Sequence, residues 1–199
     1  MMPTLRTVCC SAKRRSVSPL ASLLAAFSLL ALAALPLASA EPLQPGQWWA
    51  TFELAGGQLN RTAPGFSDNS ARFYLGLAGG MAVDSHLLLG IGVSGWLIQA
   101  ENVKDPSTGS GISRVFAVAR IYPQADSTLH YQVGGGTITG WDNSPSGSRR
   151  NGFGWEVGIG YDVMTSTRAA FTPFLRYSSG TAGNLKLSAV TLGAGFTWR

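Results

Sequence analysis

Residues 41–199 of this chain contain no cysteine. Both cysteines of the sequence, Cys9 and Cys10, precede a long apolar run, whereas a lipid-attachment cysteine would follow it. The lack of later thiols excludes disulfide bridges and cysteine-based metal sites from residues 41–199. A small secreted domain held together by disulfides is therefore excluded.

The longest apolar run lies near the N-terminus. A basic segment at residues 13–15 is followed by an almost wholly apolar stretch at 20–37 and an Ala-Ser-Ala tripeptide at 38–40. This order is typical of a cleaved secretory signal peptide. An uncleaved anchor is the alternative, because the run nearly reaches membrane-spanning length, but the Ala-x-Ala site favours cleavage. We predict a signal peptide over residues 1–40 and one domain over residues 41–199.

The predicted mature chain also lacks an excess of positive charge. The whole sequence has a formal charge of +5, but four of its 15 basic residues lie in the predicted signal, and all ten acidic residues follow it. Eleven basic and ten acidic residues remain, a net charge of +1. Nucleic-acid binding requires a basic face, so we predict no nucleic-acid partner.

Helical periodicity is missing from residue 48 onward, whereas alternation with a period of two residues recurs. In the run 87–97, for example, Leu89 and Ile91 alternate with Gly90 and Gly92. Large apolar residues therefore gather on one face of each run, and small or polar residues on the other. We predict strands near residues 47–57, 70–81, 87–98, 112–122, 128–138, 152–162, 169–178 and 186–198.

Alternation alone fits two architectures. The apolar face points into the core of a soluble β-sandwich, but toward lipid in a membrane barrel whose lumen holds the small and polar face. The connections favour the barrel, because long loops and short turns alternate along most of the chain, and the seventh connection, Ser179–Leu185, is shorter than the other outer ones. The predicted long loops are Leu59–Asn69, Gln99–Gly111 and Thr139–Asn151, and the short turns are Ala82–His86, Pro123–Ser127 and Val163–Arg168.

Aromatic residues also favour a membrane barrel. They gather near the ends of the predicted strands, where rings at the two membrane interfaces form girdles. We assign these positions to Trp48, Phe73, Trp96, Tyr122, Trp141, Phe153, Tyr161, Phe171, Tyr177 and Trp198.

The predicted inner face is rich in glycine but carries charges of both signs. Eight strands enclose a lumen just wide enough for side chains to fill, and charges there can meet one another and trapped water. A soluble core of this size would rarely hold so many. We predict an ion pair between Glu156 and Arg176, within a network that also includes Glu53, Arg114 and Arg120.

Together these features resemble the outer-membrane β-barrel domain family, the small eight-stranded barrels of the OmpA/OmpX and opacity-protein kind. The resemblance covers nearly all of residues 41–199, and the alternating run Val190–Trp198 resembles the family's signal for the barrel-assembly machinery, here followed by Arg199. It implies an all-β, antiparallel, up-and-down transmembrane barrel of eight strands in the outer membrane of a Gram-negative bacterium. The expected partners are outer-membrane lipid, lipopolysaccharide and the assembly machinery, and the expected state is a monomer.

Two motifs invite other interpretations. Gly90–Gly95 matches the dinucleotide fingerprint G-x-G-x-x-G, but no helix is predicted after it to hold a pyrophosphate. His130 invites comparison with lipid A deacylases, which resemble this chain in overall plan and use a Ser-His-Glu site. That family has its serine two residues after the histidine, where this chain has Gln132, and Glu156 is poorly placed to orient the ring. The other histidine, His86, lies in a predicted turn.

We therefore predict no catalytic residue, no cofactor, no metal and no enzymatic activity. The leading interpretation is a structural or surface-interaction barrel whose outer loops contact lipopolysaccharide or host factors. Arg149 and Arg150 could bind phosphates or a polyanion, but a solvated loop tip is the simpler explanation and the one we favour. A lipid A-modifying enzyme and a narrow pore remain alternatives.

Overall fold

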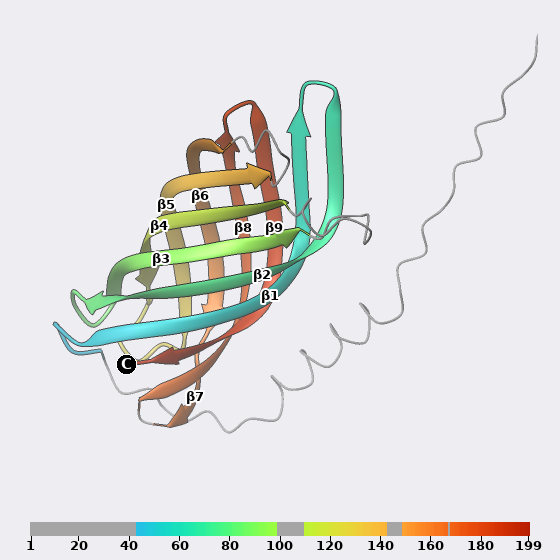
Figure 1. Cartoon of the computed structure of the whole chain (residues 1–199). Helices are drawn as coiled ribbons and strands as arrows, with labels where there is room; N and C mark the ends of the chain where they lie inside the picture. The colour runs from blue at the N-terminus through green and yellow to red at the C-terminus, as the bar shows by residue number, and fades with distance from the viewer. Residues whose placement is uncertain (1–42, 99–109, 143–148, 167) are drawn as a thin grey trace, which may run out of the picture. The chain divides into compact units, whose positions relative to one another are not determined.

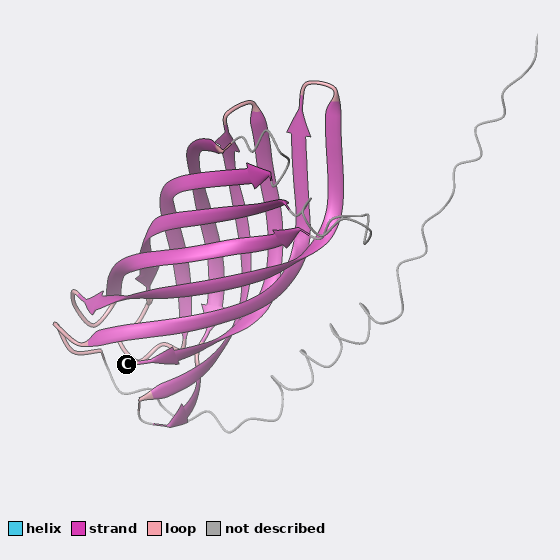
Figure 2. Cartoon of the chain, in the orientation of Figure 1, coloured by secondary structure: helices cyan, strands magenta, loops and turns pink. Residues whose placement is uncertain are grey.

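A computed structural model describes residues 43–98, 110–142, 149–166 and 168–199. The predicted signal peptide over 1–40 lies outside the described residues. Within the described ranges every regular element is a strand (Figure 2). None of these residues forms a helix long and apolar enough to cross a membrane.

The strands form one closed antiparallel barrel (Figure 1). Each strand pairs with its sequence neighbours, except that β6 pairs mainly with β5 and β8, and β9 returns to pair with β1. β6 and β7 are separated only by Asp162 and both pair with β8. They therefore form one interrupted strand of the wall, and the barrel has eight strands in all. The strands are β1 (Trp48–Ala63), β2 (Phe66–Ala82), β3 (Leu87–Ile98), β4 (Ser110–Ile121), β5 (Leu129–Asp142), β6 (Arg150–Tyr161), β7 (Val163–Ser166), β8 (Ala169–Ala182) and β9 (Leu185–Trp198).

The first predicted loop is wrong. Residues 59–69 are almost entirely strand, and only Pro64 and Gly65 form the turn between β1 and β2. Gly65 has a φ of 76°, and proline followed by such a glycine is the signature of a type II turn. The resulting hairpin projects beyond the end of β3, because β2 pairs with β3 only from Phe73 onward (Figure 1). Polar residues in this stretch indicate strand above the membrane rather than loop.

The other connections also differ in length from the prediction. Both ends of the loop predicted at Thr139–Asn151 are strand, because β5 continues to Asp142 and β6 begins at Arg150, and residues 143–148 lie outside the described part of the chain. Of the loop predicted at Gln99–Gly111, residues 99–109 lie outside the described part of the chain. The turn predicted at Val163–Arg168 contains the short strand β7. We call the end that carries the β1–β2 hairpin the outer end, and the opposite end, with its short turns, the periplasmic end.

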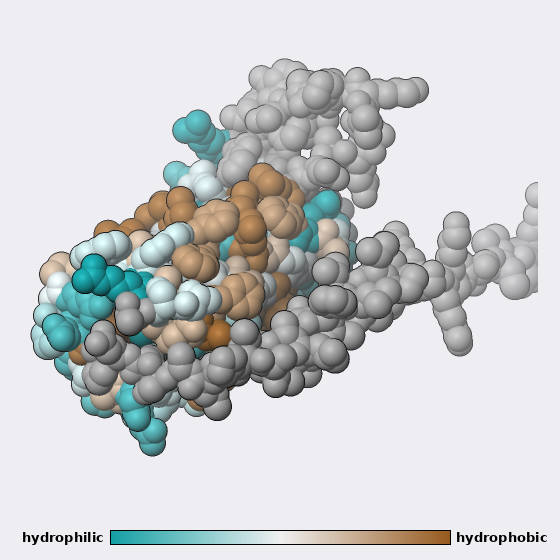
Figure 3. Space-filling view, turned by 90° about the horizontal axis from the view of Figure 1, so that it is seen from below, coloured by the Kyte–Doolittle hydropathy of each residue, from teal (hydrophilic) through white to brown (hydrophobic). Residues whose placement is uncertain are grey.

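The outer wall of the barrel is apolar. Ile91, Phe153 and Trp48 are 65%, 63% and 62% exposed, and large apolar side chains cover the outward positions of most strands. Figure 3 shows hydrophobic side chains over the wall and hydrophilic ones gathered at one end. A soluble monomer rarely exposes so large an apolar surface. The wall therefore faces hydrocarbon, as the alternation predicted.

Six of the predicted girdle aromatics point outward and are exposed, but two do not. Trp96 and Tyr122 are each only 2% exposed and face the lumen, because the strand pleat at those positions turns inward. Tyr161 is half-buried, and the side chain of Trp141 lies outside the described part of the chain. The six confirmed residues are Trp48, Phe73, Phe153, Phe171, Tyr177 and Trp198.

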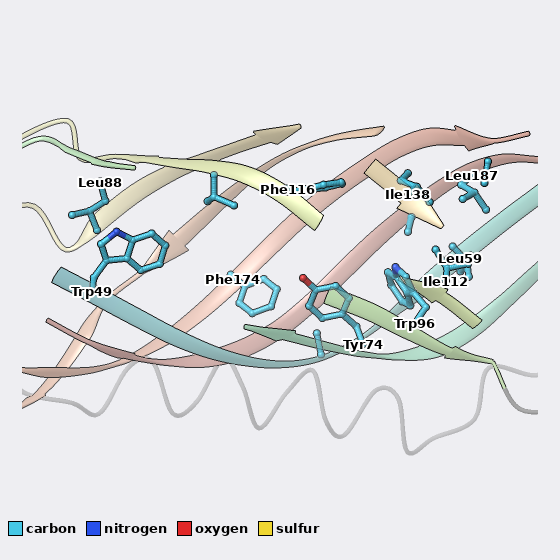
Figure 4. Packing of buried hydrophobic residues seen from close by; sticks show 14 of the residues in the cluster. Trp49, Leu59, Tyr74, Leu88, Trp96, Ile112, Phe116, Ile138, Phe174 and Leu187 are labelled. Carbon is cyan, nitrogen blue, oxygen red and sulfur yellow. The ribbon is translucent and has the colours of Figure 1, made fainter. Parts of the chain in front are cut away.

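The lumen also contains a cluster of large apolar side chains, whereas the sequence predicted mainly glycines and charged residues there. Figure 4 shows one group of large side chains toward the outer end and a smaller group, Trp49 and Leu88, at the other end. Gly57 makes room for this packing, because a Cβ there would lie 2.2 Å from the Val190 carbonyl oxygen and 3.0 Å from the Trp96 ring. The outer group is Leu59, Trp96, Ile112, Ile138 and Leu187.

Candidate functional site

The middle of the lumen holds an ionic layer centred on Glu53. This carboxylate faces inward from β1 and is 4% exposed. Arg176 of β8 donates to both of its oxygens at 2.9 Å, and Arg120 of β4 donates at 3.3 Å. The Tyr74 hydroxyl accepts from Arg176 at 2.9 Å and donates to Glu53 at 3.3 Å. Side chains from β2, β4 and β8 therefore meet at one carboxylate of β1.

A second carboxylate, Glu156 of β6, completes the layer. Its oxygens lie 3.3 Å from the Arg114 guanidinium and 3.6 Å from Nε of Arg176, which confirms the predicted Glu156–Arg176 pair. The Gln132 amide links the two halves, since it donates to Glu156 at 2.8 Å and accepts from Arg120 at 3.0 Å. All five charged residues predicted for the inner face are thus buried in one network.

The three arginines of the layer are also held by aromatic rings. The guanidinium carbon of each lies 4.7 Å from a ring centroid: Arg120 over Trp49, Arg114 over Phe116 and Arg176 over Phe174. A planar guanidinium can accept a carboxylate at its edge and a ring on its face at the same time. Apolar and ionic residues therefore interlock across the lumen.

A second polar cluster, at the periplasmic end, was not predicted. Its centre is Asp162, which is fully buried and accepts hydrogen bonds from Tyr122 and Thr172 at 2.8 Å each. Arg199 donates to Asp162 as well, and to the Tyr122 hydroxyl at 2.8 Å. The Thr197 hydroxyl joins the cluster to the ionic layer, since it accepts from Arg120 at 3.3 Å and contacts the Thr172 hydroxyl at 3.2 Å.

In the sequence Arg199 is only an extra residue after the last aromatic, but in the structure it closes this end of the lumen. Asp162 and Glu156 are an even number of residues apart on one strand run, so both point inward. This alternation is the one sequence signal that could have indicated a buried position for Asp162.

His130 lies beside this cluster and not beside Glu156. It is 2% exposed, its Nδ1 is 3.6 Å from Asp162, and within the described residues that nitrogen has no hydrogen-bond partner. The nearby Gln132, where a deacylase would have serine, is fixed in the ionic layer. His86 lies in the exposed β2–β3 turn, where its Nδ1 contacts the Ser85 hydroxyl at 2.9 Å.

Three solved structures of small barrels share the fold of this chain. Ail, the attachment invasion locus protein of Yersinia pestis, matches with a TM-score of 0.59 and 12% identity, covering 78% of this chain and 100% of that one. Neisserial surface protein A matches with a TM-score of 0.54 and 17% identity, covering 76% of this chain and 96% of that one. A second Ail structure, in complex with the heparin analogue sucrose octasulfate, matches with a TM-score of 0.51 and 13% identity, covering 76% and 99%.

The chain has the fold of a small outer-membrane β-barrel. No family model matches its sequence, and no curated protein matches it. At 12–17% identity the likeness lies in the fold alone.

Little space remains inside this outer-membrane barrel. Three lumen cavities, beside His130, beneath Trp96 and beside Tyr74, each measure about 10 Å³. A cavity of that size holds about one water molecule. Each of these three cavities can therefore hold an isolated water, but not an acyl chain, a sugar or a nucleotide. The glycines of Gly90–Gly95 lie within β3, where strand packing explains them.

At the outer end of the barrel the described charges are mostly positive. Arg149 and Arg150 are exposed where β6 begins, and Lys186 is exposed at the start of β9. In the projecting hairpin, Asp68 contacts Arg61 at 2.6 Å and Arg72 at 3.5 Å. The hydrogen bond from Arg61 holds the pKa of Asp68 below its usual value. The outer surface can thus present cations to an anionic ligand.

Proposed function

We propose that this outer-membrane barrel serves a structural and surface-interaction role, and that it neither conducts solutes nor catalyses a reaction. The observation that carries the proposal is the filled lumen. An apolar group at the outer end, the ionic layer and the Asp162 cluster follow one another along the barrel axis. Only the outer surface and its loops remain to meet other molecules.

The enzymatic alternative has less support. A deacylase needs a serine beside its histidine and a carboxylate that orients the ring, at a surface that lipid can reach. His130 has Asp162 beside it, but it is buried in the lumen and next to a cavity too small for substrate. We propose that His130 belongs to the polar packing of the periplasmic end.

For the partner we propose phosphorylated or sulfated saccharides outside the cell, either lipopolysaccharide or a host polyanion. The exposed cations at Arg149, Arg150 and Lys186 favour such ligands. Ail, a protein of the same fold, has been solved with a sulfated sugar, the heparin analogue sucrose octasulfate. We further propose that the chain is a monomer, exported with its signal peptide removed and inserted by the barrel-assembly machinery.

Three measurements test the proposal. Purified protein in planar bilayers should show no porin-size conductance, because eight strands leave no aqueous channel. The mass spectrum of lipid A should be the same with and without the gene. Binding to immobilised heparin should weaken in Arg149→Gln with Arg150→Gln, and stay unchanged in Arg168→Gln, an exposed arginine at the opposite end. Discrete conductance steps, or lipid A that loses an acyl chain only when the gene is present, would overturn it.

A further inference from the structure

On four adjacent strands of the barrel, the outward residues change from apolar to polar toward the outer end. Cross-strand register aligns the outward residues of β8, β9, β1 and β2 in rows. The row nearest the outer end is Thr181, Lys186, Thr62 and Ser67. The next row is Ser179, Ser188, Asn60 and Asn69. We call these eight residues, with Gln58 of the following row, the polar strip.

The polar strip borders the apolar wall directly. Its third row contains Tyr177 and Val190 beside Gln58, and the fourth contains Leu175, Leu192 and Phe73, all exposed apolar residues. Rows two residues apart are separated by about 7 Å along a strand. The polar strip therefore begins within one row of the hydrocarbon, at the depth where the headgroups of the outer leaflet lie.

The chemistry of the polar strip is that of a sugar-phosphate site. It offers five hydroxyls, three amides and one ammonium group, and it contains no carboxylate. Two of the amides contact each other, because Gln58 donates to the Asn69 oxygen at 2.7 Å. Hydroxyls and amides can both donate to and accept from a saccharide, and the single cation, Lys186, complements a phosphate.

We propose that the polar strip binds the phosphorylated saccharide headgroup of lipopolysaccharide in the same membrane. The headgroup lies flat against the sheet, with its phosphate at Lys186 and its sugar hydroxyls on the rows of serine, threonine and asparagine. This inference rests on the proposed outer-membrane surface role and names one partner and its site. It concerns lipid beside the barrel wall, whereas the proposal for Arg149 and Arg150 concerns ligands outside the cell.

Native mass spectrometry of the full barrel tests the inference. Protein released from nanodiscs that contain equal amounts of diphosphorylated lipid A and phosphatidylglycerol should retain lipid A preferentially. Lys186→Gln should reduce lipid A retention by roughly two- to fivefold, the range for one exposed ion pair. Arg168→Gln, which removes an exposed cation at the periplasmic end, should leave it unchanged.

A second arm identifies the phosphate as the group that Lys186 meets. Removing the phosphates from lipid A should lower retention by the wild-type barrel, but should cause no further loss in Lys186→Gln, because the contact is already gone. Asn60→Val should lower retention of both forms of lipid A, since it removes a sugar contact. Equal retention of lipid A and phosphatidylglycerol, or equal phosphate effects in both proteins, would overturn the inference. Conductance of the same preparations tests the sealed barrel separately, so the two failures are distinguishable.

Discussion

Glu53→Gln is the most informative single change in the lumen. The substitution keeps the shape of the side chain but removes the charge that accepts two hydrogen bonds from Arg176 at 2.9 Å and one from Arg120 at 3.3 Å. Removing one partner of a buried ion pair typically costs about 3–5 kcal/mol, because the other charge stays buried without compensation. We expect a cost in that range, and a smaller one for Glu156→Gln, whose arginine contacts are longer at 3.3 and 3.6 Å.

The assay is equilibrium unfolding in urea of barrels refolded into lipid vesicles, with heat-modifiable gel mobility as a second readout. Glu53→Gln combined with Arg176→Met removes one charge of each sign, so the surplus of one positive charge in the layer is unchanged. The double variant should therefore be at least about 1 kcal/mol more stable than the sum of the single effects predicts. Additive effects, or a cost of Glu53→Gln below that of Glu156→Gln, would refute this account of the layer.

Four further predictions concern other parts of the barrel. Arg199→Gln should lower the free energy of unfolding in urea by about 3 kcal/mol, because it leaves Asp162 buried without its guanidinium. Ile91→Arg, at an outward position that is 65% exposed, should lower the stability of vesicle-inserted barrels by about 2–4 kcal/mol. Gly57→Ala should lower the free energy of unfolding by about 1–3 kcal/mol in the same assay, since the new Cβ would overlap a backbone oxygen 2.2 Å away. An NMR titration of Asp68 should give a midpoint below 3.8, so the hairpin contact persists at neutral pH and is lost as the pH falls through that midpoint.

Three of these predictions have a matched control. Gly56→Ala is the partner for Gly57→Ala, because Gly56 faces outward and a Cβ there would meet nothing within 4 Å. Ile91→Leu keeps the apolar wall and should be nearly neutral. Arg61→Gln should move the Asp68 midpoint back toward 3.8. A Gly57→Ala barrel as stable as Gly56→Ala would contradict the close approach, and an unmoved Asp68 midpoint would contradict the role of Arg61.

The alternation of inward and outward positions along each strand, here called residue parity, explains what the sequence could predict. Glu53, Arg120 and Glu156 fall on the small or polar face of alternating runs, so their inward position followed from the pattern alone. The same parity holds for Trp96, but its place near a strand end favoured a girdle, and only the packed lumen decides between the two. Parity gives the direction of a side chain and not its neighbours.

Closure of the barrel explains what the sequence could not predict. Tyr122, Asp162, Thr172 and Arg199 lie far apart in the chain and meet only when β4, β6, β8 and β9 are joined around the lumen. The long β1–β2 hairpin escaped prediction for another reason. Above the membrane both faces of a strand can be polar, so the alternation that identified the other strands disappears there.

Three groups of side chains fill the lumen one after another along the barrel axis. They are the apolar group around Trp96, the ionic layer around Glu53 and the cluster around Asp162. Tyr74 packs on Trp96, and Arg120 donates to Thr197, so neighbouring groups are in contact. Under the proposed function, a substitution in one group should leave the side chains of the other two across the axis. We therefore expect changes at either mouth of the barrel to leave its conductance unchanged.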